Sequence, residues 1–255
     1  MLSRTFKTDQ LIVNVYDSRT EMGQNAAIEA AAYLRHLLAH KKEVYAIFAA
    51  APSQNEFLAG LAAAPDIDWQ RVHALHMDEY VGLAADAPQG FGNFLKRSIF
   101  DKVPFASVNY IGTEKDPERA CADYEKLLAE HPIDIVFMGI GENGHIAFND
   151  PHVADFDDPQ RIKKVDLDLV CRQQQVHDGC FANLDEVPLY ALTLTIPTLF
   201  SADRIFCIVP AATKAQAVKS TVYGEVSPAC PASILRRHGY ATLYVDNDSG
   251  KYIIE

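Results

Sequence analysis

The chain contains 255 residues, of which 49% are hydrophobic and 22% are charged. These values are those of an ordinary globular protein and exclude a mainly disordered chain. The formal net charge of −11 disfavours binding to nucleic acid, whose phosphates attract lysine and arginine. A small anionic substrate is still compatible with this charge, because a few local cations and helix N-termini set the potential inside a pocket.

The cysteines and the N-terminal segment indicate a compartment. Five cysteines are present, and none forms a CxxC pair, which favours free thiols in a reducing cytosol over disulfides or a cysteine metal site. No stretch approaches the roughly 20 apolar residues that span a bilayer. Residues 1–10 lack the apolar core of a signal peptide. We therefore expect a cytoplasmic protein that binds neither membranes nor nucleic acid.

Strand-like and helix-like segments alternate along the chain. In chain order the sequence predicts a strand at 11–16, a helix from Asp17 or Ser18 to about 40, a strand at 43–48, a helix at 54–63, a strand at 71–76, a Gly/Ala/Pro-rich loop at 82–92 and a helix at 93–99. It then predicts a strand at 108–111, a helix at 117–131, strands at 133–140, 190–195 and 204–209, helices at 213–223 and 232–237, and a strand at 241–245. This alternation predicts a single-domain α/β fold over residues 1–255, a doubly wound, Rossmann-like open sheet that is mostly parallel, with helices on both faces.

Polar clusters follow three of the predicted strands, where ligands bind in such sheets. One lies in the segment Gly139 to Pro151. Its glycines, Gly141 and Gly144, let the chain approach a ligand closely. His145 can hold a proton near neutral pH, and Asp150 or Asn143 can orient its imidazole. This pattern is typical of a general acid/base, although a turn with a surface histidine remains an equal alternative on chemistry alone.

The second cluster is the acidic pair Asp78-Glu79, which directly follows an apolar strand. Packing does not require two acids there, and one can serve as a base that removes a proton next to a carbonyl. A helix N-cap or a solvated loop is the alternative. We choose Asp78 over Glu79 because Asp78 is nearer to the predicted sheet edge.

The third cluster is a strand–turn–helix segment, Ala49 to Gln54, of a kind that suits a phosphate, although it lacks glycine and its serine can equally cap the helix. Lys214 lies at the start of a later helix, where it opposes the helix dipole unless it faces an anion; an exposed lysine is the alternative. His73, His76 and His177 have no metal-binding spacing with these residues, and HExxH is absent, so we predict no catalytic metal.

At these residues the chain resembles the glucosamine-6-phosphate deaminase family, also called glucosamine-6-phosphate isomerases, over nearly its whole length. The resemblance rests on Met77 to Leu83, Gly144 to Pro151, Val187 to Thr193 and Pro231 to Leu235. The sister group, the 6-phosphogluconolactonases, shares the fold. It typically has Arg after the Asp-Glu pair and Gly-His-Thr-Ala-Ser after the strand, so Tyr80 and Ile146 to Asn149 favour the deaminases.

The resemblance implies an enzyme that needs no cofactor and acts on a small phosphosugar. His145, tuned by Asp150, would open the sugar ring, and Asp78 would move a proton from C2 to C1 before water adds and ammonia leaves. Asn143 belongs to the same catalytic group. Substrate and phosphate contacts would come from Ala50, Pro52, Ser53, Gln54, Gly141, Gly144, Arg172 and Lys214.

Several positions depart from the family pattern. Asn143 stands where the family commonly has Asp, and an amide can orient an imidazole but cannot stabilise imidazolium by charge. Asp150 stands where the family has the longer Glu. The loop Ala49 to Gln54 lacks the usual glycines and hydroxyls, and His177 or Asp178 replaces a second Arg that many deaminases carry after Arg172. These departures keep open a lactonase, a galactosamine-6-phosphate enzyme, an aldose–ketose isomerase or a non-catalytic sugar-phosphate sensor.

One segment of the sequence bears on regulation. Arg161-Ile162-Lys163 resembles a segment with which some deaminases bind an activator between subunits, but we favour a loop with two solvated cations. The family includes monomers and hexamers, so the sequence leaves a homo-oligomer open.

Overall fold

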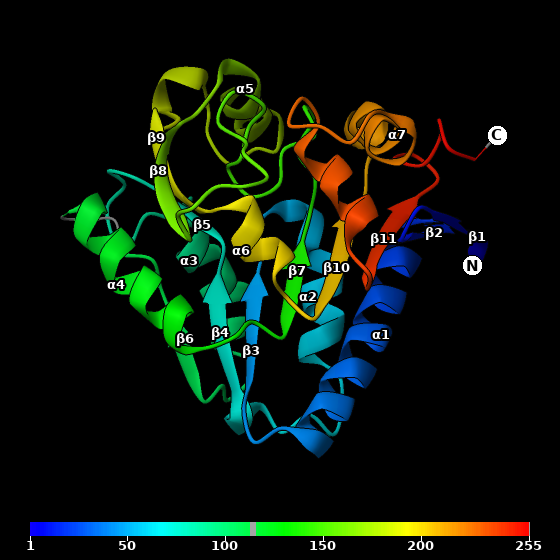
Figure 1. The fold of residues 1–255 in the computed structure, drawn as a ribbon, viewed down its shortest axis with the longest axis horizontal. Coiled ribbons are helices and arrows are strands. Elements are labelled where there is room, and N and C mark those ends of the chain that lie inside the picture. The colour runs from blue at the N-terminus through cyan, green and yellow to red at the C-terminus, as the bar shows by residue number, and fades with distance from the viewer. Residues whose placement is uncertain (113–115, 255) are drawn as a thin grey trace.

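The computed structural model describes residues 1–112 and 116–254 and contains two sheets (Figure 1). The larger sheet has eight strands in the order β1-β2-β11-β10-β7-β3-β4-β6. Its neighbouring strands are parallel except for the hairpin β1–β2. In chain order these strands are β1 (Leu2–Thr8), β2 (Leu11–Tyr16), β3 (Val44–Phe48), β4 (Val72–His76), β6 (Ser107–Asn109), β7 (Ile135–Met138), β10 (Arg204–Val209) and β11 (Ala241–Asp246).

Helices cover both faces of this sheet (Figure 1). One face carries α1 (Arg19–His40), α2 (Asn55–Ala62) and α3 (Phe91–Leu95), which continues as a π-helical turn, η3 (Lys96–Phe100). The other face carries α4 (Pro117–Glu130), α6 (Ile196–Phe200), α7 (Ala215–Tyr223) and the 3₁₀ helix η6 (Pro231–Arg237). The remaining short 3₁₀ helices are η1 (Pro52–Gln54), η2 (Trp69–Arg71), η4 (Leu184–Glu186) and η5 (Ala212–Lys214).

The strands contribute alternate residues to two hydrophobic cores. Ile47 and Val136 belong to the core beneath α4, α6 and α7, whereas the adjacent Phe48 and Phe137 belong to the core beneath α1 and α2. Successive side chains of a strand point to opposite faces, so a sheet covered on both sides requires continuous apolar strands. The near-continuous apolar run of β7 meets this requirement and places β7 in the middle of the sheet.

A second, antiparallel sheet lies beyond the carboxyl ends of the parallel strands (Figure 1). Its order is β5-β9-β8, from β5 (Asp78–Tyr80), β9 (Tyr190–Leu194) and β8 (Ile162–Asp166), and α5 (Leu169–His177) follows β8. This sheet matters for the site because β5 begins two residues after β4 ends, and pairing with β9 fixes the backbone of Asp78 opposite Thr193.

The predicted fold class is confirmed: the sheet is mostly parallel and helices cover both faces. Ser18, rather than Asp17, is the N-cap of α1, and its hydroxyl accepts the amide of Glu21. The prediction was wrong in placing all strands in one sheet, since the strand at 190–195 belongs to the antiparallel sheet. The solvated loop expected around Lys163 is in fact strand β8, and the Lys163 ammonium pairs with Asp158 at 2.7 Å.

The strands β1 and β5, the α-helices α5 and α6, and the 3₁₀ helices η2 and η4 were not predicted either. None of the described helices combines the length and the apolar character that a bilayer span requires.

Candidate active site

A cleft opens where β3, β4, β7 and β10 end, beneath α5 and the small sheet. It receives residues from six separate segments of the chain, so that residues far apart in the sequence share one cavity. Its lining comprises Ala49, Ala50, Ala51, Ser53, Gln54, Met77, Asp78, Phe91, Gly139, Ile140, Gly141, His145, Ala147, Phe148, Gln174, Gln175, Asp178 and Lys214.

The loop after β7 places His145 in this cleft. The amide of Gly141 donates to the carbonyl of His145 at 2.9 Å, so the loop folds back on itself. A Cβ on Gly141 would lie 2.1 Å from His145 Cε1, and only glycine leaves room for the imidazole. Gly144 has a φ of +87°, and a Cβ there would lie 2.8 Å from the sulfur of Cys230. Both glycines therefore shape the loop around the histidine.

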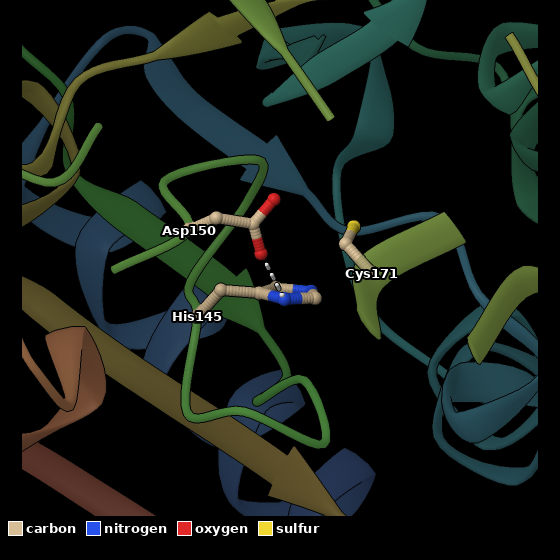
Figure 2. Close-up of side chains that lie close together, drawn as sticks. All are labelled: His145, Asp150 and Cys171. Carbon is tan, nitrogen blue, oxygen red and sulfur yellow. Dashed lines mark ion pairs between the residues drawn. The ribbon is translucent and has the colours of Figure 1, made fainter. Parts of the chain in front are cut away.

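Two oxygens hold the Nδ1 nitrogen of His145. Asp150 Oδ1 lies 2.9 Å from Nδ1 (Figure 2), and Asn143 Oδ1 lies 2.8 Å from it. Because both neighbours accept hydrogen bonds, the proton of the neutral ring is on Nδ1, and Nε2 is the basic nitrogen. Asp150 is fully buried. Burial alone would raise the pKa of Asp150, but the hydrogen bond and charge of His145 outweigh it and lower that pKa.

Asp78 reaches the same cleft from β5. Its side chain is 6% exposed, and burial raises the pKa of Asp78 well above its usual range, with a further contribution from Glu79. A carboxylate with a raised pKa is a stronger base, as proton abstraction requires. Glu79 points elsewhere: its carboxylate accepts the amides of Tyr80, Phe91 and Gly92 at 2.8–3.0 Å. Glu79 thus anchors the loop that precedes α3.

Lys214 provides a cation to the cleft from η5, after β10. Its side chain is 5% exposed, and its Nζ has no hydrogen-bond partner among the described residues. Burial lowers the pKa of Lys214, although Asp178 and Glu142 oppose this effect. Gln54 lines the same cleft, and its Nε2 donates to Ser53 Oγ and to the carbonyl of Ile208, both at 3.1 Å. A buried ammonium without a partner is costly, so this arrangement suits an incoming anion.

Comparison with known proteins places this geometry in a family. A family model described as glucosamine-6-phosphate isomerases/6-phosphogluconolactonase matches residues 17–244. The chain belongs to this family. The match confirms the resemblance inferred from the motifs around Asp78 and His145.

Curated relatives and solved structures of the glucosamine-6-phosphate isomerase family agree. A glucosamine-6-phosphate deaminase of Listeria monocytogenes is 36% identical over 212 residues, covering 83% of this chain and 88% of the relative. A glucosamine-6-phosphate deaminase of Bacillus cereus is 36% identical over 185 residues, which cover 72% of this chain and 68% of the relative. A solved monomeric glucosamine-6-phosphate deaminase has a TM-score of 0.84 at 27% identity, covering 94% of this chain and 98% of that one. A 6-phosphogluconolactonase of Thermotoga maritima, with a TM-score of 0.76 at 17% identity and coverage of 92% and 99%, shares the fold.

Some residues expected in the site of this isomerase-family chain lie outside the cleft. Arg172 is turned away, and its guanidinium donates to the carbonyls of Leu184 and Val187. Pro52 begins η1, and its carbonyl accepts from Arg19 rather than facing the lining. Asn143, Gly144 and Asp150 are not lining residues either: Asn143 and Asp150 contact the His145 ring, and Gly144 precedes it in the loop. Ala50, Ser53, Gln54, Gly141 and Lys214 do line the cleft.

Helix α5 contributes residues that the sequence interpretation missed. Gln174 and Gln175 are buried in the lining, and Gln174 Oε1 accepts the amide of Glu142 at 2.8 Å, which holds the loop that carries His145. Asp178, at the end of α5, also lines the cleft. One signal was available: Asp168 is a good N-cap residue, and its carboxylate accepts the amide of Cys171 at 2.6 Å.

Among the residues that the structure describes, two groups of side chains are close enough to hold a metal ion, which the sequence did not predict. Ligand atoms of His145, Asp150 and Cys171 lie within 4.8 Å of one another, and all three residues are buried (Figure 2). Burial raises the pKa of the Cys171 thiol well above its usual range, which disfavours the thiolate that a metal binds. His145 Nδ1 and Asp150 Oδ1 are 2.9 Å apart, which is a hydrogen-bond distance. A proton between these two atoms therefore fits this group better than a metal ion. The second group is Asp150, His152 and Asp168.

Proposed function

We propose that the protein converts glucosamine 6-phosphate and water into fructose 6-phosphate and ammonia. The observation that carries this proposal is that Asp78, His145 and Lys214 converge on one cleft, and that the Lys214 ammonium has no hydrogen-bond partner among the described residues. Relatives named glucosamine-6-phosphate deaminases, 36% identical over most of the chain, support the substrate.

Ring opening is assigned to His145. Its Nε2 takes the proton of the anomeric hydroxyl, and the same proton passes to the ring oxygen as the C1–O5 bond breaks. During this step the imidazole carries a positive charge. The carboxylate of Asp150, 2.9 Å from Nδ1, stabilises that charge, while Asn143 keeps the ring oriented.

Isomerisation is assigned to Asp78. Its carboxylate removes the proton from C2 of the open-chain sugar and returns it to C1, while a proton of the amino group passes to O1, so the aldose amine becomes a ketose imine. Water adds to C2 of the imine, and ammonia leaves. The raised pKa of Asp78 favours acceptance of a weakly acidic carbon proton. Lys214 binds the phosphate and so keeps C1 and C2 near the two acid/base groups.

A turnover assay tests the proposal. Ammonia release is measured with glucosamine 6-phosphate and galactosamine 6-phosphate, fructose 6-phosphate formation with the first, and acid release with 6-phosphogluconolactone. We expect turnover only with the first, and its loss in Asp78→Asn, which keeps size and removes the base. Glu79→Gln is the matched control, because Glu79 bonds backbone amides rather than facing the cleft. Equal activity of wild type and Asp78→Asn, or faster turnover of the lactone, would refute the proposal.

The cellular setting forms part of the same proposal. We place the enzyme in the cytoplasm, as a hydrolase of amino-sugar catabolism. All five cysteines are free, as reducing conditions would keep them. Cell fractionation tests this placement, and recovery of the protein outside the cytosolic fraction would contradict it.

A further inference from the structure

Asn143 is held by four hydrogen bonds. Its Oδ1 accepts the backbone amide of His145 at 3.0 Å and lies 2.8 Å from His145 Nδ1. Its Nδ2 donates to Asp150 Oδ1 at 2.9 Å and to Asp168 Oδ2 at 3.3 Å. A carboxamide has two acceptor sites and two donor hydrogens, so each is used once. The two carboxylates on the nitrogen side force the oxygen to face the imidazole.

Asp168 thereby links the active site to helix α5. Its Oδ2 accepts from Asn143, while its Oδ1 accepts the Cys171 amide and caps α5. It is only partly buried, whereas Asp150 is fully buried, so the two carboxylates meet Asn143 from different environments. We propose that Asp168 is a positioning residue of the active site and that, together with Asp150, it requires an amide at position 143.

Asn143 is thus suited to its two carboxylate neighbours, although it departs from the family pattern. The family commonly has an acid at this position, and the amide then looks like a loss of function. In this chain an acid at 143 would keep both acceptor bonds to His145 but lose both donors. Its carboxylate would lie against those of Asp150 and Asp168, at the 2.9 and 3.3 Å where hydrogen bonds now form. Like charges at such distances repel strongly in a partly buried site.

A double-mutant cycle tests the inference. Asn143→Asp should lower kcat/KM by about tenfold or more. Asp168→Asn keeps the cap of α5, because asparagine and aspartate cap helices equally well, and should lower kcat/KM by less than about threefold. In the double variant the new amide at 168 can donate to the new carboxylate at 143. We expect the kcat/KM of the double variant to exceed that of Asn143→Asp by at least about threefold. Asp168→Asn would then lower kcat/KM in the wild type and raise it in Asn143→Asp.

The kinetic measurement rests on the proposed function, but thermal stability does not. The charged or titratable groups around position 143 are His145, Asp150 and Asp168, with His152 beside the two acids. Cys171 also approaches Asp150. The melting temperature of Asn143→Asp should fall below that of wild type at pH 7. Asp168→Asn should restore the melting temperature of Asn143→Asp, because it removes one of the carboxylates that face position 143.

The control is Asp166→Asn, which removes the same charge from an exposed side chain two residues away. It should not restore either activity or stability to Asn143→Asp. If Asn143→Asp does not fold but the double variant does, the inference is supported. The inference is overturned if Asn143→Asp has the kcat/KM and melting temperature of the wild type, or if the double variant improves on neither value. It is also overturned if Asp166→Asn restores Asn143→Asp as well as Asp168→Asn does.

Discussion

The imidazole of His145 lies against the α-carbon of Gly141, so closely that a methyl group there would lie 2.1–2.3 Å from three ring atoms. Gly141→Ala must therefore displace the ring from Asn143 and Asp150. A shift of about 1 Å in a catalytic group can cost on the order of a hundredfold in rate. We expect kcat for glucosamine 6-phosphate to fall by about that factor, with a smaller change in KM.

The matched control is Gly239→Ala, because a Cβ on Gly239 meets no atom within 4 Å. It should leave steady-state kinetics unchanged. Wild-type kcat in Gly141→Ala would contradict the proposed role of His145.

Lys214→Met should separate stability from substrate binding. The substitution removes a buried ammonium that no described residue accepts from, so the free protein should become more stable by about 1 kcal/mol. It also removes the cation proposed to meet the phosphate, and KM should rise by about 10- to 100-fold. Denaturant titration and steady-state kinetics measure the two effects. A lower stability with unchanged KM would show that Lys214 serves the fold instead.

Stability should decrease in mild acid because of His76. Its Nδ1 donates to the carbonyl of Asp78 at 2.9 Å, and its Nε2 accepts the amide of Ile111 at 2.8 Å, so the buried ring must be neutral. Burial lowers the pKa of His76 from 6.5 to about 4. Between these two pKa values the unfolded chain therefore binds more protons than the folded protein. The contribution of neutral His76 to the free energy of unfolding is fully present above pH 6.5 and is lost as the pH falls towards 4.

The loss amounts to roughly 3 kcal/mol over that range. The free energy of unfolding, measured in urea at several pH values between 7.5 and 4.5, should decrease accordingly. His76→Gln should be less stable at neutral pH but should depend less on pH. Parallel curves for the two proteins would count against this assignment.

Ala211 has a φ of 84° and a ψ of 145°, a conformation that glycine adopts far more easily than alanine. Ala211→Gly should therefore stabilise the protein by about 1 kcal/mol. Ala212→Gly, one residue later at ordinary φ, should destabilise it by about 0.5–1 kcal/mol. The melting temperatures of the two variants test both expectations. A lower melting temperature for Ala211→Gly would show that the backbone at Ala211 is not strained.

The parallel strands and their helices could be predicted because their burial pattern is simple. β7 and β10 are apolar on both sides, and α1 begins at a serine cap. β1 escaped prediction because it is an exposed edge strand with few apolar residues. β8 escaped because Lys163 and Lys164 interrupt its buried positions, Ile162 and Val165.

The candidate site was predictable where one short segment carries it, as for His145 and Asp150. It was not predictable where tertiary contacts decide. Arg172 and Gln174 lie on the same helix, yet only Gln174 faces the cleft. Nothing in the local pattern distinguishes the two faces of α5, because the loop that α5 covers comes from a distant part of the chain. Asp168 stayed hidden for the same reason.

The strand order has a consequence for synthesis of the protein. The last strand, β11, lies between β2 and β10, so the N-terminal hairpin joins the sheet only through residues 241–246. α1 packs on α2, which follows it closely, and also on β10 and β11, which begin at residues 204 and 241 and leave the ribosome much later. The nascent chain must therefore carry the part of α1 that faces β10 and β11 uncovered through most of translation. A chain stalled before β11 would hold every proposed catalytic residue yet lack a continuous sheet, and it would be a natural client for chaperones.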